Sequence, residues 1–516
     1  MHIILSGAFI KEELQFELGE LPPAFLPIGN KRLFEYQINE IRSMNQYEEI
    51  YLSVPLNYEI NSRDDEYFSK NNIHIVRTVD GITIGEGVSA VLKNINIDER
   101  VSILYGDTLI SDLPQQDSIV AIGKTQDHYN WYLDSNHKYF LNVWAGYFSF
   151  HSALIVIKGL KDFNDDFINF VSNQVELGFL SKVIVSNWLD LGHVATYYRS
   201  RSKLTTERSF NSISVSKNCL IKSSSNHIKL QAEASWYQTI PSSIRRLTPN
   251  FIEDNTDAES PSYSLEYLYF LPLNELYVHG NLDMSGWEKI LIATFEYFDE
   301  ASKINPPVQL LNNLERNRSK LLKAKTLERL SQFESDCMLD FDKPVIVNGI
   351  KLPQINQITD DLIESMLKFP SIYSLVHGDY CFSNVLYDGR SQTIKMIDPR
   401  GLDHNQEKTI YGDLIYDLAK FYHSAIGLYD FIIADAYEIN IKNQEIYFKI
   451  NSNTQVEHVG TLLKEKEVIQ GIKVQDMIPL VAILFLSMIP LHSDNKRRQM
   501  AFLANALCLY SEIKNL

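Results

Sequence analysis

The sequence predicts two domains of different class, an α/β domain followed by an α+β domain. In about the first 200 residues, short apolar segments alternate with helical patterns, which is typical of a doubly wound parallel sheet. A polar, charged stretch at 199–209 follows, and it contains no apolar period. Beyond this stretch the order changes, because hairpin patterns come first and long helical patterns come afterwards.

Composition limits the classes of function that the chain can serve. The 516 residues are 45% hydrophobic, so the chain can bury the cores of two or three domains. The formal net charge of −17 predicts that the chain does not coat nucleic acid, because it has no basic surplus to displace counterions. The four cysteines are scattered and show no metal-binding or redox spacing, which favours a reducing cytoplasm. The sequence leaves the oligomeric state open.

The sequence predicts no insertion into a membrane. The N-terminal MHIILSGAF lacks the basic start and the long apolar core of a signal peptide, and it predicts a first strand instead. The most apolar run, Met477–Leu491, is short for a membrane span and has a proline near each end. We therefore expect this run to form a buried helix.

Strands and helices alternate along the first domain. Ligands of doubly wound sheets lie beyond the carboxyl ends of the strands, so residues at strand ends are candidates for a site. The predicted strands are His2–Leu5, Tyr51–Val54, Ile73–Val76 and Val101–Tyr105, and the predicted helices are Arg32–Met44 and Gly87–Ile95.

Two aspartates follow apolar stretches in this domain. Asp107 comes after the strand Val101–Tyr105, and Asp190 follows Trp188-Leu189. Two carboxylates on one Mg²⁺ suit the attack of a sugar phosphate on the α-phosphate of a nucleotide, since the metal neutralises the charge that develops there. Asp107 and Asp190 are therefore candidate metal ligands. The alternative is that Asp107 only caps its strand.

Four short segments of the first domain resemble the sugar-phosphate nucleotidyltransferases and occur in that family's order. The resemblance implies a Rossmann-like, GT-A type fold over 1–205 and a nucleoside triphosphate (CTP, UTP or GTP) as a substrate. The segments are Leu26–Lys31, similar to LPV-G-K-P-L, Tyr105–Thr108, similar to the GD metal site, Ala145–Phe148, similar to the N-A-G-I-Y strand, and Trp188–Gly192, similar to the D-x-G metal site.

The phosphate-binding loop departs from that family. A G-G-x-G-T-R loop should follow the first strand, where glycines let backbone N–H groups approach the triphosphate. This chain has Ser6–Lys11 there, with one glycine and no arginine, and Pro23-Ala24 where the family has Pro-Lys. Lys31 and Lys11 are the candidate cations in their place. The alternative is a domain that has kept the fold and only binds a ligand, a partner or a glycan precursor.

The segment His377–Gly401 contains H-x-D-x-x-x-x-N, followed by a short apolar strand that ends at Asp398. Phosphoryl transfer from ATP needs a carboxylate to accept the proton of the substrate hydroxyl, and an amide oxygen and a second carboxylate to hold Mg²⁺. Asp379 is the candidate base, and Asn384 and Asp398 are the candidate metal ligands. A hairpin with its turn at Asp388-Gly389 is expected to return Asp398 to Asn384.

These residues look like the catalytic and metal loops of the aminoglycoside phosphotransferase and choline kinase family, which is related to the protein kinases. The resemblance implies a bilobal α+β kinase-like fold over 206–516, with a small lobe over 206–270 and a large lobe over 271–516. It also implies Mg²⁺ and ATP as cofactors. The alternative is a turn at His377-Gly378-Asp379 and a strand-end cap at Asp398.

The small lobe has a candidate ion pair for ATP. Cys219–Lys222 is predicted as the second strand of a hairpin that begins at Ser212, and Ile228–Tyr237 as a helix. Lys222 is the candidate for the lysine that binds the α- and β-phosphates, and Glu233 for its helical partner. Lys229 competes for this role, and two solvated surface charges are the alternative.

Other segments resemble parts of the same family. The apolar strand Ser264–Phe270 resembles the interlobe hinge, where backbone groups at about Glu266 and Leu268 would bind the adenine edge; an ordinary core strand is the alternative. Tyr411–Ala419 resembles the family's G-D-x-x-Y-D-L-A helix, in which Asp417 is expected to brace the catalytic loop. His377 is expected to orient that loop, and Arg400 to contact a phosphate or to brace it.

Two functions are consistent with these patterns. The first is a bifunctional enzyme that phosphorylates a small hydroxylated molecule with ATP and couples the phosphate to a nucleotide, in capsule or lipopolysaccharide precursor synthesis. A sugar or polyol leads as the acceptor, with choline or ethanolamine as the runner-up. The second function is a small-molecule kinase with a non-catalytic binding domain. A scaffold of two degenerate enzyme folds is disfavoured by the intact set of Asp379, Asn384 and Asp398.

Overall fold

The computed structural model describes residues 1–93, 98–127, 132–134, 141–204, 211–216, 218–335 and 337–515. The chain divides into two compact units, one of Met1–Thr205 with His279–Asn281 and one of Thr206–Val278 with Leu282–Leu516. This division falls within the polar stretch 199–209, and helix α7 (Val194–Lys203) extends into the start of that stretch. Residues 205–209 lie outside the described residues.

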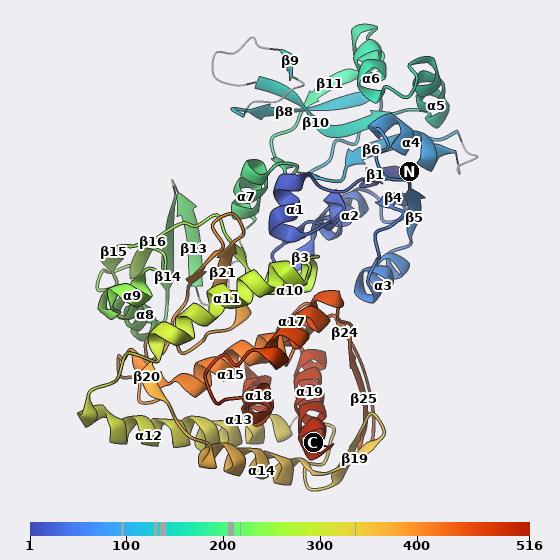
Figure 1. Cartoon of the computed structure of the whole chain (residues 1–516). Helices are drawn as coiled ribbons and strands as arrows, with labels where there is room; N and C mark the ends of the chain where they lie inside the picture. Colours follow the sequence, from blue (N-terminus) through green and yellow to red (C-terminus); the bar gives the residue numbers. More distant parts are fainter. Residues whose placement is uncertain are drawn as a thin grey trace. The chain divides into compact units, whose positions relative to one another are not determined.

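The first unit is built on an eight-stranded sheet with the order β11-β8-β10-β6-β1-β4-β5 and β9 beside β10 (Figure 1). The prediction of a parallel sheet is correct for β1, β4, β5 and β6. It is wrong for β10, which runs antiparallel to β6 and β8. Strands buried on both faces are apolar in either direction, so their sequence does not reveal the reversal. The strands are β1 (His2–Leu5), β4 (Ile50–Pro55), β5 (Ile73–Thr78), β6 (Val101–Tyr105), β8 (Ile119–Thr125), β9 (Tyr132–Asp134), β10 (Leu141–Phe150) and β11 (Ser181–Ile184).

Helices pack on this sheet and bury an apolar core between them. The predicted helix at 32–44 is confirmed as α2 (Leu33–Met44), and α4 (Ile84–Leu92) begins at a capping box of Thr83 and Glu86. The predicted end of α4 at Ile95 lies outside the described residues. The other elements of this unit are α1 (Glu12–Leu18), α3 (Ser62–Lys70), α5 (Ala153–Asp162), α6 (Phe167–Glu176), and the strand pairs β2 (Pro27–Ile28) with β3 (Lys31–Arg32) and β7 (Thr108–Ile110) with β12 (Trp188–Asp190).

The small lobe of the second unit is a four-stranded antiparallel sheet against which α8 packs (Figure 1). The predicted hairpin is confirmed, with Ser216 opposite Cys219, while Lys217 lies outside the described residues. The predicted strand to Phe270 ends earlier, at Glu266, where the chain leaves the sheet. The elements are β13 (Asn211–Ser216), β14 (Cys219–Ser224), β15 (Phe251–Asn255), β16 (Ser262–Glu266), α8 (His227–Thr239) and α9 (Ser242–Arg245).

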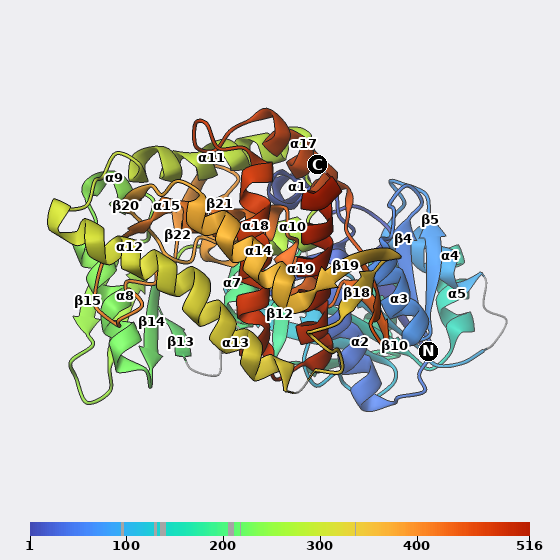
Figure 2. The ribbon, with the colours of Figure 1, turned by 90° about the horizontal axis from the view of Figure 1, so that it is seen from below.

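The large lobe is mainly helical and is centred on α18 (Val474–Met488). The predicted burial of this helix is confirmed, because it packs against α13, α14, α15 and α19. Within the described part of the chain, Val474–His492 is the one helix long and apolar enough to cross a membrane, and 67% of its apolar window is buried inside the protein. Helices α12 and α13 continue one another through a π-helical turn at Lys320–Ala324 (Figure 2). The long helices are α11 (Met284–Ala301), α12 (Leu311–Ser319), α13 (Lys325–Glu334), α14 (Ile355–Lys368), α15 (Leu414–Ala425), α17 (Thr454–Glu465) and α19 (Lys496–Asn515).

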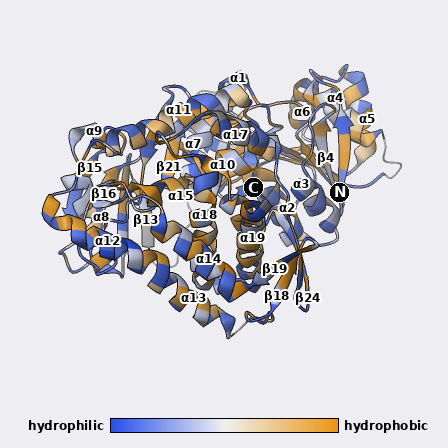
Figure 3. Cartoon of the chain, turned by 60° about the horizontal axis from the view of Figure 1, so that its bottom comes forward, coloured by the Kyte–Doolittle hydropathy of each residue, from blue (hydrophilic) through white to orange (hydrophobic). Residues whose placement is uncertain are grey.

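A second sheet lies in the large lobe. It has four strands, in the order β19-β18-β25-β24. Helices α13 and α14 carry hydrophilic and hydrophobic residues on different faces (Figure 3). The remaining elements are β17 (Leu271–Pro272), α10 (Leu273–His279), β18 (Pro344–Val347), β19 (Ile350–Gln354), β20 (Tyr373–Leu375), β21 (Val385–Asp388), β22 (Thr393–Met396), β23 (Tyr411–Asp413), α16 (Tyr429–Ile433), β24 (Tyr437–Lys442) and β25 (Glu445–Ile450).

Candidate active sites

One buried carboxylate holds the loop that carries Asp379. Asp417, on α15, accepts hydrogen bonds from the backbone N–H groups of His377 (2.7 Å) and Gly378 (2.8 Å). The Tyr297 hydroxyl donates a third hydrogen bond to it, at 2.5 Å. Asp417 is fully buried, so it cannot contact a substrate. The predicted bracing role of Asp417 therefore has a direct structural basis.

His377 connects the catalytic loop to the strand that precedes Asp398. Its Nε2 atom lies 2.9 Å from the carbonyl oxygen of Ile397, and its Nδ1 atom accepts a hydrogen bond from the Asp379 N–H at 3.3 Å. Burial lowers the pKa of His377 to about 4, so the ring is neutral at physiological pH. A neutral ring with its proton on Nε2 satisfies both contacts. His377 thus orients the loop, as expected.

Asp379 is held ionised by a residue that the sequence does not point to. The Lys420 Nζ atom lies 2.9 Å from Asp379 Oδ1. Burial by itself would raise the pKa of Asp379, but the charge and hydrogen bond of Lys420 lower it to about 2. The Asp379 side chain remains 42% exposed, so an acceptor hydroxyl can reach it. Lys420 lies on α15 three residues after Asp417, and that helical spacing is the only sequence signal for it.

Asn384 and Asp398 are brought together by the predicted hairpin. β21 and β22 pair Val385 with Met396, and the Ile397 N–H donates to the Asn384 carbonyl oxygen at 2.9 Å. The Asn384 amide nitrogen donates to the backbone oxygen (2.9 Å) and the carboxylate (3.2 Å) of Asp379. The Asn384 side-chain oxygen accepts one long hydrogen bond, from the Ser383 hydroxyl at 3.5 Å, so it retains a lone pair for a metal. This donor set fits Mg²⁺, which prefers oxygen ligands.

Lys222 bridges the small lobe and the metal loop. Its Nζ atom lies 2.7 Å from Glu233 Oε2 and 3.0 Å from Asp398 Oδ1, and its side chain is 2% exposed. The expected ion pair is thus present. The competing Lys229 lies 3.8 Å from Glu233 and is 52% exposed. Asp398 has a φ of +58°, which is uncommon outside glycine, and its N–H donates to the Tyr237 hydroxyl at 3.2 Å.

The predicted hinge offers fewer free backbone groups than expected. The Glu266 N–H donates to the Asn250 carbonyl oxygen at 2.9 Å, and the Tyr267 N–H donates to that of Asn218 at 2.7 Å. The Glu266 carboxylate accepts a hydrogen bond from the Asn250 side chain at 2.9 Å. These N–H groups are therefore engaged within the small lobe. Leu268 lies beyond the last residue of β16, outside the sheet.

In the first unit, Asp107 and Asp190 converge on Gly192. The Gly192 N–H donates to Asp190 Oδ1 at 3.0 Å, and the Leu191 N–H donates to the Asp107 carbonyl oxygen at 2.8 Å. A methyl group on Gly192 would lie 2.3 Å from Asp107 Oδ2 and 3.4 Å from Asp190 Oδ1. Burial, and then the charge of Asp190, raise the pKa of Asp107 to about 6. A divalent cation would relieve this repulsion, so the pair fits Mg²⁺.

A cavity of about 180 Å³ lies at the carboxyl ends of β1, β4 and β6, beside Asp107. Lys31 is not among its lining residues; it is exposed, and its Nζ atom lies 5.7 Å from the centre of the Tyr36 ring. The charge of Lys11 lowers the pKa of Asp107, and its Nζ atom lies 3.1 Å from His193 Nε2. The structure therefore places Lys11, and not Lys31, near the candidate metal ligands. Residues of β1, of the following loop and of the N-terminus of α4 contribute to the lining, including Ser6, Gly7, Thr83 and Ile84.

Neither site has a larger set of ligands in the described part of the chain. No group of three or more His, Cys, Asp or Glu side chains that could hold a metal ion is found there. Each site therefore offers two protein ligands. Mg²⁺ is commonly bound by one or two carboxylates together with water and phosphate oxygens, so two ligands are sufficient.

Comparison by sequence finds no relatives, since no protein-family model and no curated protein matches the chain. Solved structures similar to parts of it are of two kinds. A nucleoside-diphosphate-sugar pyrophosphorylase from Vibrio cholerae covers 39% of this chain and 99% of its own, at 12% identity and a TM-score of 0.31. The inositol-1-phosphate CTP transferase from T. maritima covers 39% of this chain and 95% of its own, at 14% identity and a TM-score of 0.30.

The second kind of structure is a kinase. A choline/ethanolamine kinase family protein from Mesorhizobium loti covers 60% of this chain and 85% of its own, at 11% identity and a TM-score of 0.34. Chemistry cannot be transferred across likenesses as distant as these. The function of this chain has to be inferred from its own residues.

Proposed function

We propose that the chain is a bifunctional transferase. The second unit phosphorylates a hydroxyl group of a small molecule with ATP, and the first unit couples the new phosphate to a nucleotide. One observation carries the kinase half of the proposal: Lys222 and Glu233 form a buried ion pair (2.7 Å), as phosphoryl transfer from ATP requires, and the pair lies beside the candidate metal ligand Asp398 (3.0 Å from Lys222). The same unit holds Asp379 ionised and partly exposed.

In the kinase reaction, each of these residues has a distinct task. Lys222 binds the α- and β-phosphates, and Glu233 fixes the position of its ammonium group. Asp379 accepts a hydrogen bond from the acceptor hydroxyl and takes its proton as the oxygen attacks the γ-phosphorus and ADP leaves. With a pKa of about 2, Asp379 is a weak base, so it mainly orients the hydroxyl until the new bond is nearly formed. Asn384 and Asp398 would hold Mg²⁺, which would neutralise charge on the phosphates.

In the nucleotidyl transfer, a phosphate oxygen of the product attacks the α-phosphorus of the nucleotide and pyrophosphate leaves. Asp107 and Asp190 are the residues that would hold Mg²⁺ there, and the cavity beside Asp107 would receive the nucleotide. Lys11 is the cation placed to meet the phosphates. Such activated products would serve capsule or lipopolysaccharide precursor synthesis in the cytoplasm.

A kinase with a first unit that only binds a ligand is the second candidate, and a specific feature favours it. Ala24 stands where the resembled family has a lysine, and it is fully buried. The loop Ser6–Lys11 also has one glycine and no arginine. Both features reduce the number of groups that could bind a triphosphate.

Phosphorus NMR of the purified chain tests the proposal. The protein is incubated with Mg-ATP and a panel of sugars, polyols and amino alcohols, and then with CTP, UTP or GTP. We expect a new phosphomonoester that becomes a diphosphate diester after one nucleotide is added. A phosphomonoester that persists with every nucleotide would support the second candidate. If the wild type formed no phosphomonoester with any acceptor, and so did not differ from an active-site variant, the kinase assignment would be contradicted.

A further inference from the structure

Four cationic side chains lie close to one another in the large lobe, and one of them contacts Asp379. We call them the cationic cluster: Lys325, Arg329, Arg400 and Lys420. Lys420 contacts Asp379 at 2.9 Å. The backbone N–H of Arg400 donates to the backbone carbonyl oxygen of His377 at 2.9 Å. A Cβ atom added to Gly378 would lie 2.7 Å from Arg400 Cβ. Arg400 is therefore packed against the residue that immediately precedes Asp379.

The other two members reach the same region from α13. The Arg329 Nη1 atom donates to the Ser487 carbonyl oxygen at 2.8 Å, and the Lys420 Nζ atom lies 4.0 Å from the sulfur of Met488. Arg329 and Lys420 thus converge on two adjacent residues of α18. Lys325 lies one turn before Arg329, so the two side chains share a face of α13.

The positive charge of the cationic cluster is only partly balanced. Lys420 pairs with Asp379, but Lys325, Arg329 and Arg400 have no carboxylate within 4.0 Å among the residues that the structure describes. All three are partly buried. Burial, followed by the charges of Arg400, Arg329 and Lys420, lowers the pKa of Lys325 to about 7. Partly buried cations without a negatively charged partner are unfavourable, and a bound anion would remove that penalty.

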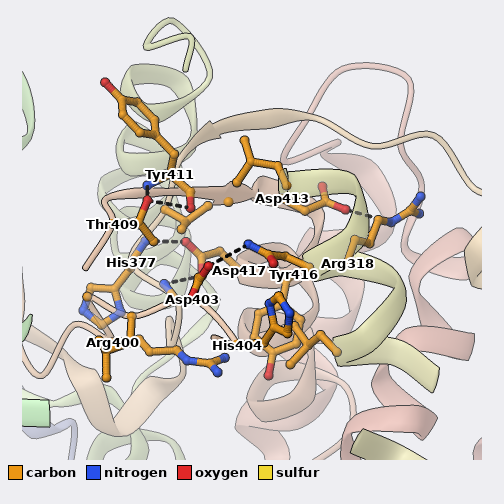
Figure 4. Close-up of a pocket in the computed structure, with 18 of the residues that line it drawn as sticks. Arg318, His377, Arg400, Asp403, His404, Thr409, Tyr411, Asp413, Tyr416 and Asp417 are labelled. Atoms are coloured by element: carbon orange, nitrogen blue, oxygen red, sulfur yellow. Dashed lines mark hydrogen bonds and ion pairs between the residues drawn. The ribbon is translucent and has the colours of Figure 1, made fainter. Parts of the chain in front are cut away.

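Asp403, a carboxylate near Arg400, does not balance this charge. Asp403 lines a cavity of about 90 Å³ together with Arg400 and His404, and the guanidinium of Arg400 extends on the side of His404 (Figure 4). Asp403 Oδ1 accepts hydrogen bonds from the backbone N–H groups of Asn405 (2.7 Å) and Glu407 (2.9 Å). Its Oδ2 atom accepts one from the Asn317 side chain at 3.2 Å. Asp403 is thus committed to its own loop.

We propose that the acceptor of the kinase site carries an oxyanion, a phosphate or a carboxylate, which Lys325, Arg329 and Arg400 bind while its hydroxyl group faces Asp379. This inference rests on the proposed kinase function and narrows its substrate class. Arginine is well suited to bind an oxyanion, because its planar guanidinium group can donate hydrogen bonds to two oxygens at once. Choline and ethanolamine, the alternative acceptors, are cations that the cluster would repel.

Binding of inorganic phosphate tests the anion site without an acceptor. Calorimetric titration of the full chain with inorganic phosphate, in the presence of Mg-ADP, is compared for the wild type and for Lys325→Met and Arg329→Gln. We expect each substitution to weaken binding by about tenfold or more, as for loss of a hydrogen bond to a charged group. Lys368→Met, on α14 and 79% exposed, is the matched control and should bind as the wild type does. Arg329→Lys should retain part of the affinity.

Three outcomes overturn the inference: phosphate does not bind to the wild type, both cluster variants bind it as tightly as the wild type does, or Lys368→Met weakens binding as much as the cluster variants do. Thermal unfolding of each variant shows whether a loss of binding reflects a loss of folding. If Arg329→Gln does not fold because its contact with Ser487 is lost, Lys325→Met alone decides, since Lys325 is half-buried and makes no such contact in the described structure.

Turnover of matched acceptors separates this inference from the proposed function. Glycerol is compared with glycerol 3-phosphate and glycerate, glucose with glucose 6-phosphate and gluconate, and choline is included. We expect phosphorylation of anionic acceptors, with a KM that rises about tenfold in Lys325→Met. Phosphorylation of a neutral or cationic acceptor that Asp379→Ala abolishes and Lys325→Met leaves unchanged would support the kinase and overturn the inference. Phosphate binding through the cluster without any turnover would support the anion site and contradict the kinase.

Discussion

The Nζ atom of Lys420 lies 2.9 Å from the Oδ1 atom of Asp379, and this contact sets the protonation state of the candidate base. Burial raises the pKa of Asp379, and Lys420 lowers it to about 2. The wild-type kinase should therefore lose no activity through protonation of Asp379 until the pH falls close to that value. In Lys420→Met, burial still raises the pKa of Asp379 but Lys420 no longer lowers it. The acidic limb of the kcat/KM profile should therefore move to higher pH, and kcat/KM at neutral pH should fall by about tenfold or more. The pH–rate profile checks this.

Lys420→Arg is the matched variant, because it keeps the charge beside Asp379. It should keep the acidic limb near its wild-type position. If Lys420→Met and Lys420→Arg gave the same profile as the wild type, the contact would have no role in setting the charge of the base.

Glu233→Gln removes the partner that holds Lys222 at 2.7 Å. Lys222 would then keep only Asp398, at 3.0 Å, and be drawn away from the phosphates. We expect the KM for ATP to rise and kcat to fall, together by about 100-fold in kcat/KM. Steady-state kinetics checks this, with Lys229→Met as the control, because that lysine is exposed and 3.8 Å from Glu233. A larger loss in the control would mean that Lys229 is the phosphate-binding lysine.

The sequence predicts those residues of the candidate kinase site that are close together along the chain. His377, Asp379, Asn384 and Asp398 lie within one loop and hairpin, so their spacing predicts that they meet. Lys222 and Glu233 are eleven residues apart, and a strand followed by a helix brings them together. In each case local structure determines which residues meet.

The remaining residues could not be predicted, because tertiary packing determines where they lie. Lys420 is 41 residues from Asp379 in the sequence, and helix α15 brings it there through its contacts with the loop, including those of Asp417 with His377 and of Ser424 with Phe382. Lys325 and Arg329 lie on an amphipathic helix, whose polar face is expected to carry charged residues in any case. Their charges therefore do not mark a site in the sequence. The antiparallel direction of β10 depends on its neighbours in the sheet, and burial on both faces conceals it in the sequence.

Asp417→Ala should destabilise the second unit. It would leave the N–H groups of His377 and Gly378 and the Tyr297 hydroxyl without their buried acceptor. The His377 N–H also donates to the Tyr297 hydroxyl at 2.7 Å, so two donors are left unsatisfied, which predicts a loss of about 2 kcal/mol or more in the free energy of unfolding as measured by urea denaturation. Asp417→Asn retains one acceptor oxygen and should lose less. An unfolding midpoint unchanged from the wild type in Asp417→Ala would show that the loop is held by other contacts.

Gly192→Ala is a targeted change in the first unit. The added methyl group would lie 2.3 Å from Asp107 Oδ2, so this carboxylate must move away from Asp190. We expect nucleotidyl transfer to fall by at least about tenfold while phosphorylation is unchanged, because metal ligands must hold their geometry closely. Gly460→Ala is the control, since a methyl group there meets nothing within 4 Å. Full coupling activity in Gly192→Ala would argue against Asp107 and Asp190 as a metal pair.

The most direct test of two independent reactions is phosphorus NMR with Asp379→Ala and Asp107→Ala, using an acceptor that the wild type turns over. We predict that Asp379→Ala forms no phosphomonoester but still couples an added one to the nucleotide with release of pyrophosphate. Asp107→Ala should form the phosphomonoester and leave it uncoupled. Loss of both reactions in either variant, or coupling that persists in Asp107→Ala, would contradict a chain with two separate active sites.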